Sequence, residues 1–350
     1  MSLYGWGDDS GESRKSDSGS ASSGGYDYTS ARKAYEEPTS KPSSGGSRII
    51  SEGSPVRSSR ISRDDDDFSS AKGKTPHPIK REKLSVVSTS THPIVVCVDH
   101  TGSFQTEVKV IVKKLPLFGT EVSKMNPDYQ ICFSLIGDTT SDRQPFQVQD
   151  FDSGPALDDR VACLFPECDG GDAPESYDLA AYYFTKHCET PNAVIKPIFI
   201  FVLDETTRPK LYGKDVREYI GDDIYQDLDS VEVLKALSEK FSVYVIVRYD
   251  GKISFWEDIY GVQRIIKMEE PSDIIELFIG IVSGELGRID EFIDSVSGRH
   301  SDRPDRVSRV MKSMKSFKSA SDTKAEDGKS VKAGTPGTGS MKSVKSKKLV

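Results

Sequence analysis

Three oxygen-bearing side chains stand at alternate positions directly after an apolar run: Asp99, Thr101 and Ser103. The run itself, residues 94–98, reads as a strand buried on both faces, as in a parallel sheet covered by helices. Open α/β sheets bind ligands at the carboxyl ends of their strands. One carboxylate and two hydroxyls on a tight turn can converge on a hard cation, because Mg²⁺ prefers oxygen ligands. The spacing therefore predicts a cation site.

Helical spacing follows the turn at once. Phe104, Val108, Ile111 and Leu115 fall on one stripe, the pattern of a helix with one apolar face. Strands are predicted at 129–137, 146–151, 195–203, 241–247 and 263–267, and helices at 156–164, 176–187, 230–240 and 272–295. This alternation implies right-handed parallel crossovers, so we expect an α/β fold with a doubly wound, mostly parallel sheet flanked by helices. The short strand at 146–151 is expected at an edge of the sheet.

Two further acidic residues are expected near the same turn. Asp204 follows the apolar run 195–203, and Gly170-Gly171-Asp172 lies in a loop that leads into the next helix. The carboxyl ends of parallel strands meet at one edge of a sheet, so these positions should meet Asp99 there.

The chain divides into three parts by composition and charge. Of its 350 residues, 35% are hydrophobic, and net charge is +1 for residues 1–92, −18 for 93–297 and +9 for 298–350. The first part has no apolar period that could form a buried face, so it cannot offset the entropy of ordering itself. We therefore expect a disordered Ser/Gly-rich polar arm at 1–92, one folded acidic domain at 93–297, and a disordered, basic Lys/Ser-rich tail at 298–350.

Residues 306–318 carry a second, separate signal. Their apolar side chains recur at helical spacing with Lys and Arg between them. Basic amphipathic segments bind acidic membrane surfaces, calmodulin-like grooves or nucleic acid. The same pattern also fits a tail that folds back on the acidic domain, and both interpretations stay open.

The cysteines and the termini bear on the compartment. Five cysteines, an odd number, are scattered without the paired spacing of a zinc site. A reducing compartment follows as the simplest assignment, the cytoplasm or else the nucleus. Residues 1–3 show no secretory signal, and the uncharged stretch 277–284 is far shorter than the roughly 20 residues that a membrane span needs. No transmembrane segment is expected.

The turn and the two acidic positions resemble the metal-ion-dependent adhesion site of von Willebrand factor type A domains. Asp99-x-Thr101-x-Ser103 is similar to the family's D-x-S/T-x-S turn, and residues 170–175 are similar to its Gly-Gly-Asp-x-Pro-Glu loop. Asp204 stands where the family has its strand-end aspartate, and the resemblance covers about residues 93–297.

This resemblance implies a Mg²⁺ or Mn²⁺ ion held by five residues of this chain: Asp99, Thr101, Ser103, Asp172 and Asp204. It also implies that Asp99 and Asp204 act largely through waters or second-shell bonds. An Asp or Glu carboxylate of a partner protein would complete the coordination. His100, where the family more usually has a small residue, is expected to face outward and to form a partner-binding rim with Gly170 and Gly171.

Three alternatives remain at this point. The hydroxyls of Thr101 and Ser103 could instead cap the following helix. An enzyme is disfavoured, because the sequence has no phosphate-binding loop, dinucleotide fingerprint or zinc-protease helix. A metal-independent scaffold or membrane-associated adaptor acting through the basic tail is the alternative to a protein-interaction module.

Overall fold

The computed structural model describes residues 85–161, 163–168, 174–315 and 317. The predicted disordered arm, up to residue 84, and the tail from residue 318 lie outside the described residues. So do Gly170, Gly171 and Asp172.

A six-stranded sheet forms the centre of the molecule, in the order β10-β9-β6-β2-β3-β4. The strands are β2 (His92–Asp99), β3 (Tyr129–Ile136), β4 (Phe146–Val148), β6 (Ile198–Leu203), β9 (Ser242–Val247) and β10 (Ile265–Lys267). Every neighbouring pair is parallel except β3 and β4, which are antiparallel. The predicted fold class is confirmed, including the short strand at one edge.

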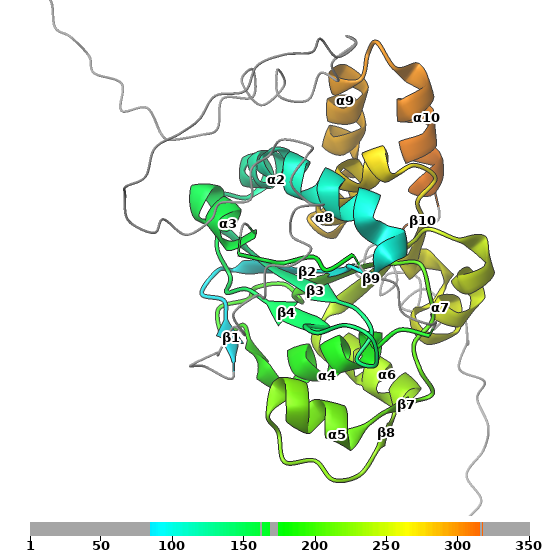
Figure 1. Ribbon diagram of the computed structural model, residues 1–350. Coiled ribbons are helices and arrows are strands. Elements are labelled where there is room, and N and C mark those ends of the chain that lie inside the picture. The colour runs from blue at the N-terminus through cyan, green and yellow to red at the C-terminus, as the bar shows by residue number, and fades with distance from the viewer. Residues whose placement is uncertain (1–84, 162, 169–173, 316, 318–350) are drawn as a thin grey trace, which may run out of the picture.

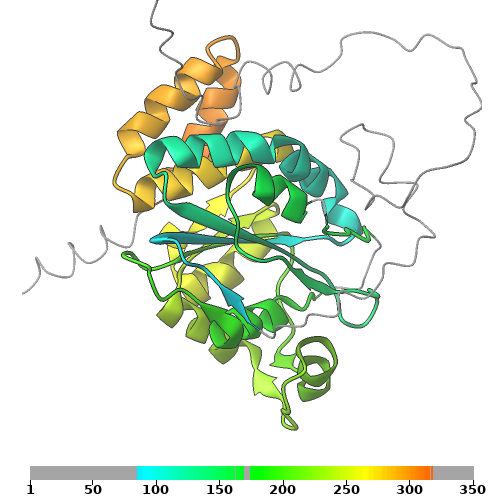
Figure 2. The ribbon, with the colours of Figure 1, turned by 90° about the vertical axis from the view of Figure 1, so that its left-hand side faces the viewer.

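Helices cover both faces of this sheet (Figures 1 and 2). One face packs against α2 (Gln105–Met125), α3 (Gly154–Val161) and α8 (Ile274–Glu285), and the other against α4 (Tyr177–His187), α6 (Ser230–Lys240) and α7 (Ile253–Tyr260). The central strand β2 alternates between the two cores: Ile94, Val96 and Val98 join the first, and Val95 and Cys97 the second. All five are at most 1% exposed, so the strand is buried on both faces, as predicted.

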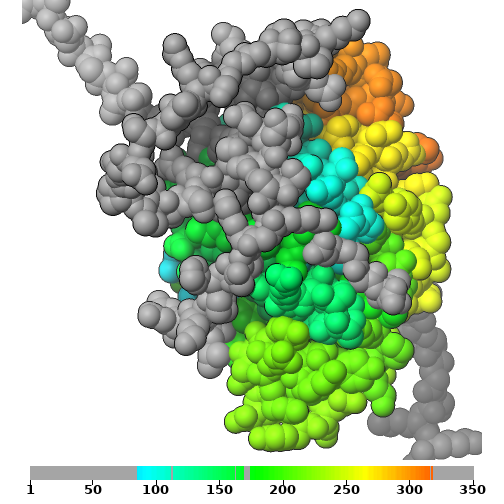
Figure 3. Space-filling model, in the orientation of Figure 1, coloured from blue at the N-terminus to red at the C-terminus, as the bar shows by residue number. Residues whose placement is uncertain are grey.

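Shorter elements connect these layers. They are β1 (Val86–Val87), which pairs in parallel with β5 (Cys188–Glu189), and the turns η1 (Gly102–Phe104), η3 (Asp250–Lys252), η4 (Val262–Arg264) and η5 (Pro271–Asp273). Residues 205–229 make an excursion between β6 and α6 that contains β7 (Lys210–Leu211), α5 (Gly213–Asp215), η2 (Val216–Ile220) and β8 (Leu228–Asp229). This excursion stands at the lower end of the molecule in Figures 1 and 3.

The end of the folded part differs from the prediction. The helix predicted at 272–295 is two helices, α8 and α9 (Ile289–Arg299), and the predicted boundary at 297 falls inside α9. The break lies at Gly287, whose φ of +67° suits glycine, and the amide of Arg288 closes α8 with a 2.7 Å hydrogen bond to the carbonyl of Ser283.

Residues 304–313, predicted to belong to a disordered tail, form α10 (Pro304–Ser313). Its apolar face is buried, with Val310 0% and Met314 8% exposed, and α9 and α10 cover the outer side of α8 (Figure 1). Phe317 reaches Gly284, where a Cβ atom would lie 2.0 Å from its ring, and stacks on Tyr244 at 5.2 Å between ring centres. Residues 306–315 and 317 of the basic segment are thus part of the folded unit, which also includes β1, ahead of the predicted start at residue 93.

None of the helices in the described part of the chain is long and apolar enough to span a bilayer. The apolar stretch that raised this question lies in α8, where every residue from Ile274 to Gly284 is buried. A helix that is apolar on all sides needs cover on all sides. Here the sheet, α2, α9 and α10 provide it.

Candidate functional site

Asp99 is the last residue of β2 and is completely buried. The turn that follows folds back on its side chain. The backbone N–H of Thr101 donates to Oδ1 of Asp99 at 2.7 Å, and the Thr101 hydroxyl donates to the same atom at 2.6 Å. Aspartate side chains commonly organise the backbone two residues on in this way. The local sequence therefore fixes the two oxygen groups side by side.

Asp204 reaches the same point from the neighbouring strand. It follows β6, which pairs in parallel with β2, so both strands end at one edge of the sheet. The hydroxyl of Ser103 donates to Oδ2 of Asp204 at 2.6 Å and lies 3.3 Å from the hydroxyl of Thr101. Four of the five predicted ligands are thus brought together, while the fifth, Asp172, is outside the described residues.

The hydroxyls do not cap a helix. Neither the start of η1 at Thr101 nor the start of α2 at Phe104 has a side-chain cap hydrogen bond. Thr101 and Ser103 donate to carboxylates instead. Because a hydroxyl that donates its proton keeps two lone pairs, both oxygens retain the capacity to bind a cation.

Among the described residues, neither Asp99 nor Asp204 forms an ion pair with a positively charged side chain. Burial, followed by the nearby charge of Asp204, raises the pKa of Asp99 to about 7. Burial also raises the pKa of Asp204, although its hydrogen bond from Ser103 and the charge of Arg248 act in the opposite direction. A cation placed between these groups would reverse the shift, because an opposite charge favours the ionised form of a carboxyl group.

Two residues of the site were not singled out from the sequence. The hydroxyl of Tyr177, at the start of α4, donates to Oδ2 of Asp99. Glu175 is only 4% exposed, and its Oε2 has no hydrogen-bond partner among the described residues. Burial first, and then the charge of Asp99, raises the pKa of Glu175 to about 8. Glu175 is the last residue of the predicted 170–175 loop and Tyr177 follows two positions later, and this position was the available signal.

His100 corrects an expectation. It was predicted to face outward on a partner-binding rim, but it is fully buried. Its ring Nδ1 accepts a 3.3 Å hydrogen bond from the amide of Glu167, and its carbonyl accepts one of 3.1 Å from Cys168. Burial lowers its pKa to about 4, so the ring is neutral near pH 7. The ring holds the segment leading to residue 169 and is not joined to Ser103 as a general base would be.

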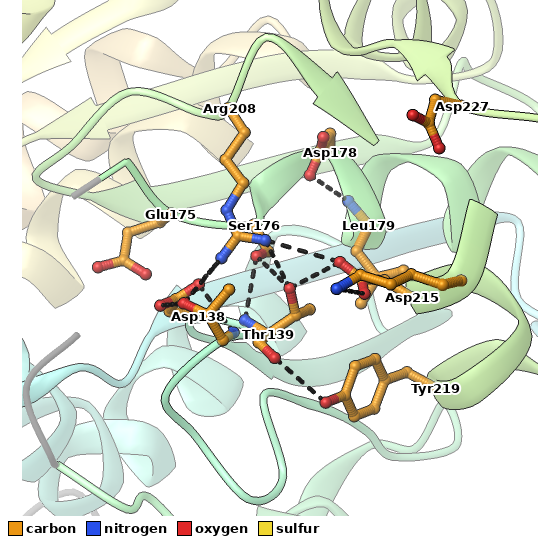
Figure 4. Close-up of polar contacts among 12 residues, drawn as sticks. Asp138, Thr139, Glu175, Ser176, Asp178, Leu179, Arg208, Asp215, Tyr219 and Asp227 are labelled. Atoms are coloured by element: carbon orange, nitrogen blue, oxygen red, sulfur yellow. Dashed lines mark hydrogen bonds and ion pairs between the residues drawn. The ribbon is translucent and has the colours of Figure 1, made fainter. Parts of the chain in front are cut away.

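A cluster around Arg208 braces the neighbouring loops (Figure 4). The guanidinium forms an ion pair with Asp138, donates to the Thr139 hydroxyl at 2.7 Å, and lies 3.6 Å from a carboxylate oxygen of Asp215. The Thr139 amide donates in turn to the Ser176 hydroxyl at 3.1 Å. The loop after β3, the start of α4 and the 205–229 excursion are thereby tied together. Figure 4 shows the Glu175 carboxylate apart from this cluster.

The side chains at the site carry only oxygen donors. Asp99, Asp204, Thr101 and Ser103 offer oxygen only, which suits Mg²⁺ or Mn²⁺ and not a soft metal. Across the described residues, no three or more His, Cys, Asp or Glu side chains form a metal-binding group. Two hydroxyls and two carboxylates fall short of the six oxygens that Mg²⁺ takes, so waters would fill the remaining positions.

Comparison with known proteins gives remote structural likeness alone. No model of a known protein family and no curated protein matches the sequence. Proximal thread matrix protein 1 from the mussel byssus is similar with a TM-score of 0.41 at 12% identity, over 59% of this chain and 49% of that one. The pilus adhesin SpaC from Lactobacillus rhamnosus GG has a TM-score of 0.40 at 10% identity, over 60% of this chain and 31% of its own. The chain spans about half the length of the first and about a third of the second.

Proposed function

We propose that this protein is a von Willebrand factor type A-like interaction module that binds an acidic side chain of a partner protein through Mg²⁺ or Mn²⁺. The observation that carries the proposal is the convergence of Asp99, Thr101, Ser103 and Asp204 from two crossovers of the sheet. In this account Thr101 and Ser103 bind the ion directly. Asp99 and Asp204 orient the hydroxyls and supply the negative charge.

The hydrogen bonds support this division of roles. Each hydroxyl donates a hydrogen bond to a buried carboxylate, so the lone pairs of the hydroxyl oxygen are left for an ion. The Tyr177 hydroxyl donates a hydrogen bond to the second carboxylate oxygen of Asp99, so the orientation of this carboxylate is fixed before an ion binds. Glu175 adds a buried carboxylate oxygen that has no partner in the described part of the chain, and this oxygen could accept a hydrogen bond from a water on the ion.

The partner's carboxylate follows from the charge balance. Two hydroxyls are neutral, so an ion held by few protein carboxylates keeps an affinity for a further anionic oxygen. Ser103 is exposed while Asp99 and Thr101 are buried, so the ion is accessible from the Ser103 side. When bound, the ion would bridge the two proteins, and chelation would release the partner.

The alternative function is an adaptor that acts through the basic tail. Part of that tail is folded as α10. α10 and Phe317 pack on α8, and Arg306 and Arg309 each form an ion pair with Asp273 of η5 at 3.0 Å. A contact of residues 306–318 with an acidic membrane or a calmodulin-like partner stays a prediction, and it would require α10 and Phe317 to leave α8. Vesicle flotation with and without residues 298–350 tests it.

Isothermal titration with Mg²⁺ and Mn²⁺ tests the proposed function. We expect heat of binding from the full chain that is lost in Asp99→Ala and in the isosteric Asp99→Asn. Asp258→Asn, which changes an exposed carboxylate on α7, is the matched control and should leave the heat unchanged. If the full chain gives no metal-dependent heat while circular dichroism shows it folded, the proposal is wrong.

A further inference from the structure

Arg248 lies beside the candidate cation site but is not one of its oxygen-bearing residues. It is the first residue after β9, which pairs in parallel with β6, so it emerges at the same edge of the sheet as Asp204. Its Nη1 donates to the backbone carbonyl of Ser103 at 2.5 Å. The guanidinium is therefore attached to the residue whose hydroxyl faces the site.

Arg248 pairs with a buried carboxylate on one side and is open to solvent on the other. Its Nη1 lies 3.1 Å from Oε1 of Glu107, which is completely buried, and 29% of the Arg248 side chain remains exposed. The guanidinium carbon lies 5.1 Å from the ring centre of Tyr249, which is 47% exposed. Arginine and tyrosine are both enriched where proteins bind partners.

A fixed positive charge at this place opposes a cation and favours an anion. The guanidinium donates to the backbone carbonyl of Ser103, so its charge lies next to the residue whose hydroxyl binds Asp204. A guanidinium presents several N–H groups in one plane and matches the two oxygens of a carboxylate. A site built only to hold a divalent ion would gain nothing from it.

We propose that Arg248 is the second contact for the partner's acidic side chain. One carboxylate oxygen binds the ion above Thr101 and Ser103, and the other accepts a hydrogen bond from the guanidinium, with the Tyr249 ring beside it. This inference rests on the proposed function and adds the residue that selects an Asp or Glu side chain over a neutral amide. Arg248 thus strengthens binding of the acid and weakens binding of the ion.

These opposite effects define the test. The full chain is titrated with Mn²⁺ and free Mn²⁺ is followed by electron paramagnetic resonance. N-acetyl-glutamate methylamide is then added, and its γ-methylene proton relaxation reports binding to the Mn²⁺-loaded protein. N-acetyl-glutamine methylamide is the neutral probe. We expect Arg248→Gln to weaken binding of the glutamate probe about tenfold and to leave Mn²⁺ affinity unchanged or higher.

Two further variants test whether the effect arises from an unpaired Glu107 or from the loss of any nearby positive charge. Arg248→Gln with Glu107→Gln removes both charges, so it leaves no buried carboxylate without its partner, and should also lose the glutamate probe. Lys252→Gln removes a nearby positive charge that pairs with Glu205 at 2.8 Å, and should keep the probe.

Each outcome is decisive. Weaker glutamate binding with intact Mn²⁺ binding in both Arg248 variants supports the proposal. Equal loss of Mn²⁺ and glutamate binding would show that Arg248 only maintains the fold of the site, and unchanged glutamate binding would show that it does not touch the ligand. Either result contradicts the proposed role of Arg248 but not the proposed cation site. A wild-type chain that binds no Mn²⁺ contradicts both the role of Arg248 and the cation site.

Discussion

The hydroxyl of Ser103 donates a 2.6 Å hydrogen bond to Oδ2 of Asp204, which lies 101 positions further along the chain. This contact joins the turn after β2 to the end of β6. It depends on the parallel register of the two strands, in which Val98 pairs with Val202. The hydrogen bond thus brings two positions that are far apart in the sequence into one candidate site.

The first prediction concerns pH and the cation together. Asp99 and Glu175 have pKa values raised to about 7 and about 8, above those of the unfolded chain. Groups of this kind hold their protons more tightly when folded, so without a cation the free energy of unfolding should fall as pH rises from about 5 to about 8. Mg²⁺ should reduce this fall, because it offsets the charges that appear.

Urea denaturation near pH 5 and near pH 8, with Mg²⁺ or with a chelator, measures the effect. Glu175→Gln should flatten the pH dependence of the chelated protein. A stability that rises with pH in the chelated protein would contradict the prediction.

The second prediction concerns acid stability and has the opposite sign. Hydrogen bonding from His300, at 2.7 Å, and the charge of Arg299 outweigh burial and lower the pKa of Glu276 to about 2. The stability from this group is therefore complete above about pH 4.5 and is lost as pH falls toward about 2.

Glu276→Gln should destabilise the protein at pH 7 by about 3 kcal/mol, the range found when one partner of a buried ion pair is removed. Glu270→Gln alters an exposed neighbouring carboxylate and is the control. Urea denaturation at pH 7 measures both, and equal stabilities for the two variants would show that the α8–α9 ion pairs contribute nothing.

The third prediction concerns the true end of the folded unit. A chain ending at 297 should lose the cover that Val310, Met314 and Phe317 give to α8. We expect it to aggregate or melt at a much lower temperature, because an exposed apolar face of this kind drives association. A chain ending at 317 should melt like the full chain.

Gly284→Val is the point test of the same contact. A side chain there meets the Phe317 ring, so the variant should be destabilised in the chain ending at 317. Thermal unfolding followed by circular dichroism measures these chains. If the chain ending at 297 is monomeric and equally stable, α10 is not part of the core.

The fourth prediction concerns the brace beside the site. Arg208→Met leaves Asp138, which is completely buried, without its ion pair, so it should cost about 3 kcal/mol of stability. The double variant Arg208→Met with Asp138→Asn should recover part of this loss. Urea denaturation of the single and double variants measures the free energies of unfolding. If the loss in the double variant equals the sum of the losses in the two single variants, the two residues are not coupled.

Much of the fold was predictable because the strands are continuous apolar runs bounded by polar residues. The positions of Asp99 and Asp204 followed from the same reasoning, since each directly follows such a run. Tyr177 and Arg208 could not be found this way. Their roles depend on which loops the tertiary structure brings together, and neither residue type signals it in advance.

For the basic segment, the sequence predicts an amphipathic helix but not what its apolar face contacts. An amphipathic helix has the same sequence pattern whether its apolar face meets lipid, a partner or its own domain. The decisive feature was on α8, where Gly280 and Gly284 admit Met314 and Phe317. His100 was misplaced for a related reason, because a polar side chain next to a buried strand was assumed to face solvent.

The most direct test of the central claim is a crystal structure of the full chain grown with Mn²⁺, with anomalous scattering used to locate the ion. The account predicts one strong anomalous peak at the edge of the sheet, within about 2.3 Å of the hydroxyl oxygens of Thr101 and Ser103. No peak there, with the two hydroxyls still donating to Asp99 and Asp204, would contradict it.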